Sequence, residues 1–319
     1  MRLCRFRHAG RVSAGFYSEA YIVPVAAAAA NYAEAGKEKL NIPDGDDLLA
    51  FLPPDGAACP GAAKLAKWVA DTAPMLPDSV KLATNSVELL VPIPRPPKLF
   101  LLAGNYAQHI EEGGGKAAQR AETFPYVFMK PPTTTLTDPG KPVKIPALSP
   151  DHIDWELELG VIIGRRAKAV KEADALKYVA GYTVVNDISD REFHPNPQRK
   201  VRTMDGFFDW LHGKWHDNFC PMGPCVVSAD AIADPQALDM KLTVNGRVRQ
   251  DSNTAYQIFP VAAVIEFLSS FVTLEPGDII STGTPGGVGD ATGTYLKPGD
   301  RIEATIRSIG TLVTPMAAP

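Results

Sequence analysis

The chain has few cysteines, and their spacing matches neither a zinc site nor a disulfide framework. Its 319 residues include only Cys4, Cys59, Cys220 and Cys225. No C-x-x-C pair occurs, and the Cys220–Cys225 spacing lacks a second ligand pair, so a zinc knuckle is not expected. So few cysteines in so long a chain are typical of a reducing compartment, which predicts a cytoplasmic protein.

An excess of positive charge is also lacking, as is a long apolar run. The chain has 32 Lys and Arg against 36 Asp and Glu, a net charge of −4, so it has no basic footprint for nucleic acid. The run AYIVPVAAAAA, Ala20 to Ala30, is too short to span a bilayer and contains Pro24. Because Glu19 precedes it, a signal sequence is not expected either. We therefore predict neither a nucleic-acid partner nor a membrane partner.

What is present is an ordinary globular composition, with 45% hydrophobic and 21% charged residues. The stretch VPIPRPPK, Val91 to Lys98, holds four prolines and predicts a stiff extended linker. We place a domain boundary there, which gives a small N-terminal domain of residues 1–94 and a second domain of residues 95–319. The first is expected to hold strands at 2–6 and 13–25 and helices at 26–40 and 61–76.

The second domain is predicted to be mostly β, because many short strand patterns occur with few helices between them. One helix is expected at Pro260–Phe271, and LTVNGRVRQ predicts a hairpin with Asn245-Gly246 as its turn. The expected fold class is α+β, mostly β, with a barrel-like or rolled sheet. Three consecutive glycines from Gly113 predict a mobile loop or lid.

The stretch DWELELG alternates acidic and large apolar residues, with Asp154, Glu156 and Glu158 on one face of a predicted strand. A strand with one solvated face would explain the alternation, but three acids without a base also favour a bound cation. Downstream, VVNDISDRE carries Asp187 and Asp190, which alone indicate a turn. Two glutamates and one aspartate would form an all-oxygen ligand set for Mg²⁺, Mn²⁺ or Ca²⁺.

Three further stretches carry candidate chemistry beside ordinary structural explanations. His109 and Glu112 are three residues apart, so in a helical turn they lie on one side, where a carboxylate would raise the basicity of the imidazole. Lys214 lies among aromatic residues and prolines, where it is either functional or covers an apolar patch. The loop STGTPGGVGD can bind a carboxylate through its amides or serve as a plain turn.

The order of the motifs GNYAQH, FMKPPTTT, DWELELGVIIG, GYTVVNDISDRE, GKWHDNFCPMGP and LEPGDIISTGTPGGVG resembles the fumarylacetoacetate hydrolase superfamily, from about Arg95 to the C-terminus. The resemblance implies the family's mixed β-roll, a homodimer and a divalent metal, Mg²⁺ first. Asp154 falls outside the implied ligand set. The implied roles are metal ligation by Glu156, Glu158 and Asp187, catalysis by His109, Glu112 and Lys214, and substrate binding by Thr284, Lys130 and Gln250.

Two departures from the family pattern affect the substrate more than the chemistry. Trp215 and His216 stand where small residues are common, and the segment Phe193–His212 is long, basic and aromatic. The reaction expected first is metal-dependent hydrolysis of a C–C bond in a 2-oxo acid of the acylpyruvate or fumarylacetoacetate type. Alternatives are isomerisation or decarboxylation of a 2-hydroxy-dienedioate, and hydrolysis or dehydration of a 2-keto-3-deoxy sugar acid. A non-catalytic binding module is a further alternative, which the intact set of candidate residues disfavours.

Overall fold

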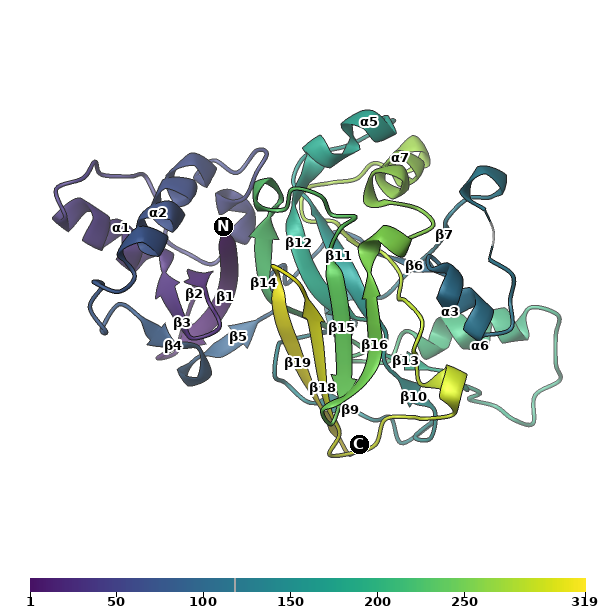
Figure 1. Cartoon of the computed structure of the whole chain (residues 1–319). Coiled ribbons are helices and arrows are strands. Elements are labelled where there is room, and N and C mark those ends of the chain that lie inside the picture. Colours follow the sequence, from purple (N-terminus) through teal and green to yellow (C-terminus); the bar gives the residue numbers. More distant parts are fainter. Residues whose placement is uncertain (118) are drawn as a thin grey trace.

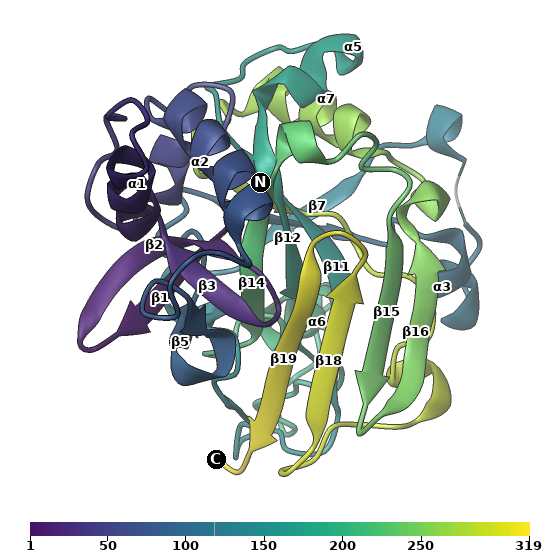
Figure 2. The ribbon, with the colours of Figure 1, turned by 60° about the vertical axis from the view of Figure 1, so that its left-hand side comes forward.

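The computed structural model describes residues 1–117 and 119–319 and confirms an α+β architecture in which strands predominate. Two layers of strands lie against each other, and the N-terminal strands and helices extend to one side (Figures 1 and 2). Both sheets mix parallel and antiparallel pairs, as predicted for a β-roll. The described strands do not close into a barrel.

The larger sheet has twelve strands, and its central strands are buried along their whole length. β5 (Glu88–Leu90) pairs with β1 and β8 (Leu136–Thr137) pairs with β14, beside the main path. Along that path the order is β4 (Leu82–Ala83), β3 (Tyr21–Pro24), β2 (Arg11–Tyr17), β1 (Arg2–His8), β14 (Cys220–Ser228), β12 (Val179–Asn186), β11 (Leu157–Ile163), β17 (Ile279–Ser281), β6 (Leu99–Ala103) and β7 (Tyr126–Met129).

The N-terminal strands continue the sheet of the second half of the chain. β1 pairs with β14 in the register Leu3↔Val226, and the Met1 amine donates to Ser228 Oγ at 2.8 Å. Helices α1 (Val25–Glu34) and α2 (Cys59–Thr72) pack beside these strands. Because α1 ends at Glu34, the helix predicted over residues 26–40 is shorter than expected. The larger sheet contains hydrogen-bonded strands from both sides of the predicted boundary near residue 94. The division into domains 1–94 and 95–319 stays a prediction.

The second sheet supplies the other layer, in the order β16 (Arg247–Asn253), β15 (Asp239–Val244), β18 (Arg301–Ile306), β19 (Gly310–Ala317) and β9 (Val143–Lys144). β15 alternates exposed and buried residues, and Met240, Leu242 and Val244 enter the core between the sheets. The predicted hairpin is confirmed: Val244 pairs with Arg247, and the turn residues Asn245 and Gly246 have φ of 52° and 75°.

The acidic segment does not form one continuous strand, so that prediction was wrong. A two-residue strand β10 (Ile153–Asp154) pairs with β13 (Ser189–Asp190), and β11 begins only at Leu157. Trp155 and Glu156 lie in the break. The three acidic side chains therefore do not share one face of a single strand, as the alternation had predicted. All three acids are buried, so the solvated strand face is also excluded.

Helix α7 (Val261–Phe271) confirms the helix predicted at Pro260–Phe271. Apart from α1, α2 and α7, the helices are short. Among the described residues, none of the helices has the length and apolar character needed to cross a membrane. The remaining elements are α3 (Ala107–Glu112), α4 (Pro132–Thr135), α5 (Glu172–Ala175), α6 (Asp205–Gly213), and the 3₁₀ turns η1 (Leu48–Phe51), η2 (Thr84–Ser86), η3 (Arg120–Glu122), η4 (Leu176–Tyr178), η5 (Ala229–Ala231), η6 (Thr254–Tyr256) and η7 (Asp290–Thr292).

Candidate active site

Three carboxylates meet where β11 and β12 run side by side. Glu156, Glu158 and Asp187 each offer an oxygen within 4.8 Å of the others, and their residues are 4%, 0% and 1% exposed. The backbone fixes this arrangement, because Asp187 N donates to Glu156 O at 2.9 Å and Glu156 N donates to Asn186 Oδ1 at 3.0 Å. The structure thus brings together all three predicted metal ligands.

Glu158 uses only one of its two carboxylate oxygens in hydrogen bonds among the described residues. Its Oε2 accepts from Ser281 Oγ at 2.5 Å and from Gly283 N at 2.9 Å, whereas Oε1 is buried without a hydrogen-bond partner among the described residues. Burial, together with the charges of Asp187 and Glu156, raises the pKa of Glu158 to about 8. A hard divalent cation accepts oxygen ligands of this kind, so the residues present fit Mg²⁺, Mn²⁺ or Ca²⁺.

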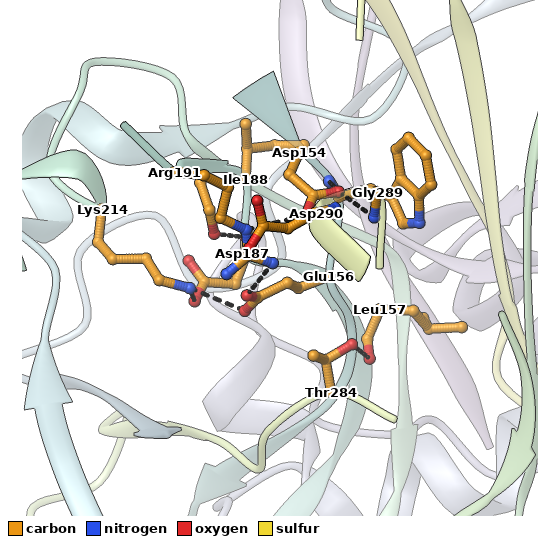
Figure 3. Close-up of polar contacts among 12 residues, drawn as sticks. Asp154, Glu156, Leu157, Asp187, Ile188, Arg191, Lys214, Thr284, Gly289 and Asp290 are labelled. Atoms are coloured by element: carbon orange, nitrogen blue, oxygen red, sulfur yellow. Dashed lines mark hydrogen bonds and ion pairs between the residues drawn. The ribbon is translucent and has the colours of Figure 1, made fainter. Parts of the chain in front are cut away.

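Buried cations balance part of this acidic cluster. Lys214 Nζ lies 2.8 Å from Glu156 Oε2 and 2.7 Å from Asp187 Oδ2, and Arg191 Nη2 lies 2.7 Å from Glu156 Oε1 (Figure 3). Burial alone would raise the pKa of Glu156, but the charges of Lys214 and Arg191 outweigh it and lower the pKa. Burial and neighbouring charges thus shift the pKa values of Glu156 and Glu158 in opposite directions.

Asp154 does not join the three carboxylates and instead holds a loop beside them. Its Oδ1 accepts from Gly289 N at 2.7 Å, and its Oδ2 accepts from Asp290 N at 3.0 Å and from Arg191 Nε at 2.8 Å (Figure 3). The sequence reasoning placed Asp154 outside the ligand set but missed Arg191. The signal was available, because several clustered acids require a nearby cation, and Arg191 follows Asp190 directly.

The predicted pairing of His109 with Glu112 is not formed in the described structure. Glu112 is exposed, and its Oε2 accepts from Gly287 N at 2.7 Å. His109 lines the site, and its Nδ1 is buried without a hydrogen-bond partner among the described residues. Burial lowers the pKa of His109, against the raising effect of Glu156. The imidazole of His109 is therefore less basic than an ordinary histidine, whereas a His–Glu dyad was expected to make it more basic.

The three predicted substrate-binding residues occupy different positions. Thr284 lines the cavity, and its hydroxyl donates to Leu157 O at 3.0 Å. Gln250 lies behind it, where its amide accepts from Leu157 N at 3.0 Å and donates to Thr284 Oγ1 at 2.8 Å. Lys130 is 1% exposed, pairs with Asp187 and donates to two backbone carbonyls. Gln250 and Lys130 are thus placed to position the site rather than to line it.

A small cavity gives access to these groups. Its volume is about 160 Å³, and its polar lining comes from His109, Glu156, Arg191, Lys214 and Thr284. The apolar side comes from β6, from Phe128 in β7 and from Trp210 in α6. Lys214 directly follows α6 as its C-cap residue, and its ammonium group lies 5.5 Å from the centroid of the Phe128 ring. The arrangement can bind a small anion next to a metal and a neutral imidazole.

The chain is similar to a known protein family along most of its length. The sequence profile of the fumarylacetoacetate (FAA) hydrolase C-terminal domain matches residues 98–317. The chain is 39% identical over 287 residues to 2,4-didehydro-3-deoxy-L-rhamnonate hydrolase from Sphingomonas sp. (strain SKA58), covering 88% of this chain and 92% of that protein. It is 37% identical over 237 residues to the mitochondrial oxaloacetate tautomerase fahd2 of Xenopus laevis, covering 74% and 70%.

A solved structure extends the similarity to the whole fold. Maleylpyruvate hydrolase from Sphingobium sp. SYK-6, in complex with manganese(II) and pyruvate, superposes with a TM-score of 0.69 at 29% identity. The match covers 100% of this chain and 99% of that one.

Proposed function

The chain belongs to the fumarylacetoacetate hydrolase family, and on that premise we propose that it is a divalent-metal-dependent hydrolase. It cleaves a carbon–carbon bond in a 2-oxo acid of the acylpyruvate or fumarylacetoacetate type. The observation that carries the proposal is the buried triad of Glu156, Glu158 and Asp187, which contacts Lys214 and adjoins a cavity lined by His109. Two of the relatives described above are named as hydrolases, which supports this choice.

The three carboxylates would hold Mg²⁺, with Mn²⁺ and Ca²⁺ as alternatives that accept the same oxygen ligands. A cation bound there would supply Lewis-acid chemistry, which polarises a 2-oxo group and stabilises enolate charge. Lys214 adds a buried ammonium group beside the same carboxylates, in a position to neutralise negative charge that develops on the substrate. Thr284, which also lines the cavity, contacts the substrate carboxylate in this proposal.

His109 is the proposed base. Burial lowers its pKa, which keeps the imidazole neutral and able to accept a proton at pH 7. It takes a proton from water, and the oxygen adds to the distal carbonyl carbon. The carbon–carbon bond then breaks, and its electron pair remains on the carbon next to the 2-oxo group. That carbon takes up the proton that His109 accepted from water, so the base is restored. We propose that Glu112 fixes α3 to the loop at Gly287 while His109 acts on the substrate.

One observation favours a second candidate, tautomerisation or isomerisation of a 2-oxo or 2-hydroxy-dienedioate acid. Because Glu112 contacts Gly287 instead of His109, the imidazole is a base without a carboxylate partner among the described residues. A single base is enough to move a proton between two atoms of an enolate system, and no activated water is needed. The relative from Xenopus laevis is named as a tautomerase. Decarboxylation and sugar-acid chemistry pass through the same enolate and are further alternatives.

We also propose that the protein is a homodimer in the cytoplasm. The dimer is supported only by the family resemblance, and light scattering of the purified protein tests it. The cytoplasmic assignment is supported by the four cysteines, which are all free thiols. A fractionation experiment with the tagged chain tests it, since some relatives are mitochondrial.

The reaction is tested by ultraviolet assays on acetylpyruvate, fumarylacetoacetate, oxaloacetate and a 2-hydroxy-dienedioate, each with Mg²⁺, with Mn²⁺ and with EDTA. Metal-dependent loss of diketo absorbance with two acid products supports hydrolysis. Turnover of only the last two substrates supports the second candidate. Glu158→Gln is expected to abolish the metal-dependent rate with little loss of fold. Glu38→Gln, which changes an exposed carboxylate that pairs with Lys64, is the matched control and should keep that rate.

A further inference from the structure

A second cavity beside the candidate active site is lined by aromatic rings. Its volume is about 560 Å³, and none of its described lining residues is charged. Several of the rings are unusually exposed, from 48% for Phe207 to 65% for Tyr126. Exposed aromatic groups in this number mark a binding surface. The rings come from the segment before β7, from β7 itself, from α6 and from α7: Phe124, Tyr126, Phe128, Phe207, Trp210 and Phe271.

This aromatic cavity adjoins the active-site cavity directly. Ala103, Phe128 and Trp210 line both of them. The Phe128 and Trp210 rings meet edge to face at 5.0 Å, and Lys214 Nζ lies 5.5 Å from the Phe128 centroid. Trp210 and Lys214 are four residues apart at the end of α6, so one helix positions both. At most one layer of side chains separates the catalytic groups from the aromatic cavity.

The active-site cavity is too small for a whole substrate. Its volume of about 160 Å³ is below the roughly 300–1,000 Å³ of ordinary ligand pockets. It has room for the 2-oxo acid group, and the rest of the molecule must extend elsewhere. Its cations are already paired, Lys214 with Glu156 and Asp187, and Arg191 with Asp154. A second carboxylate on the substrate would meet no charged side chain among the described residues that line the aromatic cavity.

Resting on the function proposed above, we propose that the substrate is an acylpyruvate whose acyl group is bulky and apolar, such as an aryl or branched alkyl group. The acyl group occupies the aromatic cavity, with the 2-oxo acid at the carboxylates. For benzoylpyruvate, water adds to the carbonyl carbon that bears the phenyl group. The bond from that carbon to the methylene then breaks, and its electron pair becomes the enolate of pyruvate. Protonation of the methylene carbon gives pyruvate, and the other product is benzoate.

The test is a binding measurement that does not require turnover. Isothermal titration calorimetry of the Mg²⁺-loaded protein compares 2-oxobutanoate, 2-oxo-4-phenylbutanoate and 2-oxoglutarate. All three have the same 2-oxo acid group, but their tails are small, apolar and charged. We expect the phenyl compound to bind about 10- to 100-fold more tightly than 2-oxobutanoate, and 2-oxoglutarate to bind more weakly than 2-oxobutanoate. Kinetics should follow, with a higher kcat/KM for benzoylpyruvate than for acetylpyruvate.

Two variants on different helices locate the effect. Phe207→Glu and Phe271→Glu place a charge in the aromatic cavity, at side chains that do not line the active-site cavity. Each should remove the preference for the phenyl compound and leave the affinity for 2-oxobutanoate unchanged. Tyr256→Glu is the matched control, because Tyr256 is 69% exposed and lies outside both cavities.

The outcomes separate the two proposals. If none of the three acids binds, the proposed function itself is wrong. If 2-oxobutanoate binds but the phenyl compound gains nothing, or if its gain survives both variants, only the apolar-substrate proposal is wrong. If both variants convert a dimer into a monomer and weaken all ligands equally, the aromatic surface is a contact between subunits, and the proposal is again overturned.

Discussion

Replacing Glu158 by Gln should stabilise the metal-free protein at neutral pH, although it removes a proposed metal ligand. Glu158 Oε1 is buried and has no hydrogen-bond partner within residues 1–117 and 119–319, and its other oxygen accepts from Ser281 and Gly283. A glutamine keeps the accepting oxygen and places an uncharged amide at the Oε1 position. It therefore resembles the protonated glutamic acid, which is the form that the buried site favours.

The sign and size of the effect follow from the pKa of Glu158, which burial raises from 4.5 to about 8. The folded protein keeps a proton on Glu158 that the unfolded chain loses. The stability linked to this proton is complete below the unfolded pKa and is lost as the pH rises through the folded pKa. At about 1.4 kcal/mol per pH unit, the free energy of unfolding of the metal-free wild type falls by on the order of 3 kcal/mol by pH 7. For a chain of this length that corresponds to about 5 °C in Tm.

The assay is differential scanning calorimetry in EDTA at pH 5.5, 6.5 and 7.5. The Tm of Glu158→Gln minus that of the wild type should rise by about 2 °C per pH unit. Glu156→Gln is the contrasting control. It leaves Lys214 and Arg191 without a carboxylate that each contacts, so it should destabilise by roughly 3–5 kcal/mol at all three pH values. A Tm difference for Glu158→Gln that is independent of pH would refute this reasoning.

Three further predictions concern residues around the carboxylates. Gln250→Ala leaves the buried Leu157 amide unpaired and should lower the free energy of unfolding in urea by about 2–3 kcal/mol; an unchanged midpoint would contradict the positioning role. Asp154→Asn weakens its buried ion pair with Arg191 and should cost about 3 kcal/mol in the same experiment, whereas a neutral result would mean that the pair is dispensable. Lys214→Met removes an ammonium group that contacts two of the proposed ligands, so calorimetry should show tighter Mg²⁺ binding while turnover falls by about 100-fold or more; weaker Mg²⁺ binding would argue against competition between the two cations.

Several features could be predicted from the sequence because neighbouring residues determine them. Asn245-Gly246 fixes the hairpin, since both residues readily adopt positive φ. The helix at Pro260–Phe271 and the alternation in the later strands depend on spacing within a dozen residues. The carboxylates of Glu156, Glu158 and Asp187 are not neighbours in the sequence; they were predicted as a group from their ligand chemistry and the family resemblance, and the structure places them within 4.8 Å of one another. Their roles as metal ligands stay a proposal.

The tertiary structure alone decided how these groups are held and which neighbours they have. The break in the acidic strand involves Gln250 and Thr284, which bind the backbone of Leu157 from 93 and 127 residues away. Glu112 bonds to Gly287 rather than to His109, across 175 residues. The aromatic cavity gathers rings from the strand β7 and from the helices α6 and α7. Spacing along the chain encodes only contacts within one element, whereas burial, ion pairing and pKa depend on which distant segments pack together.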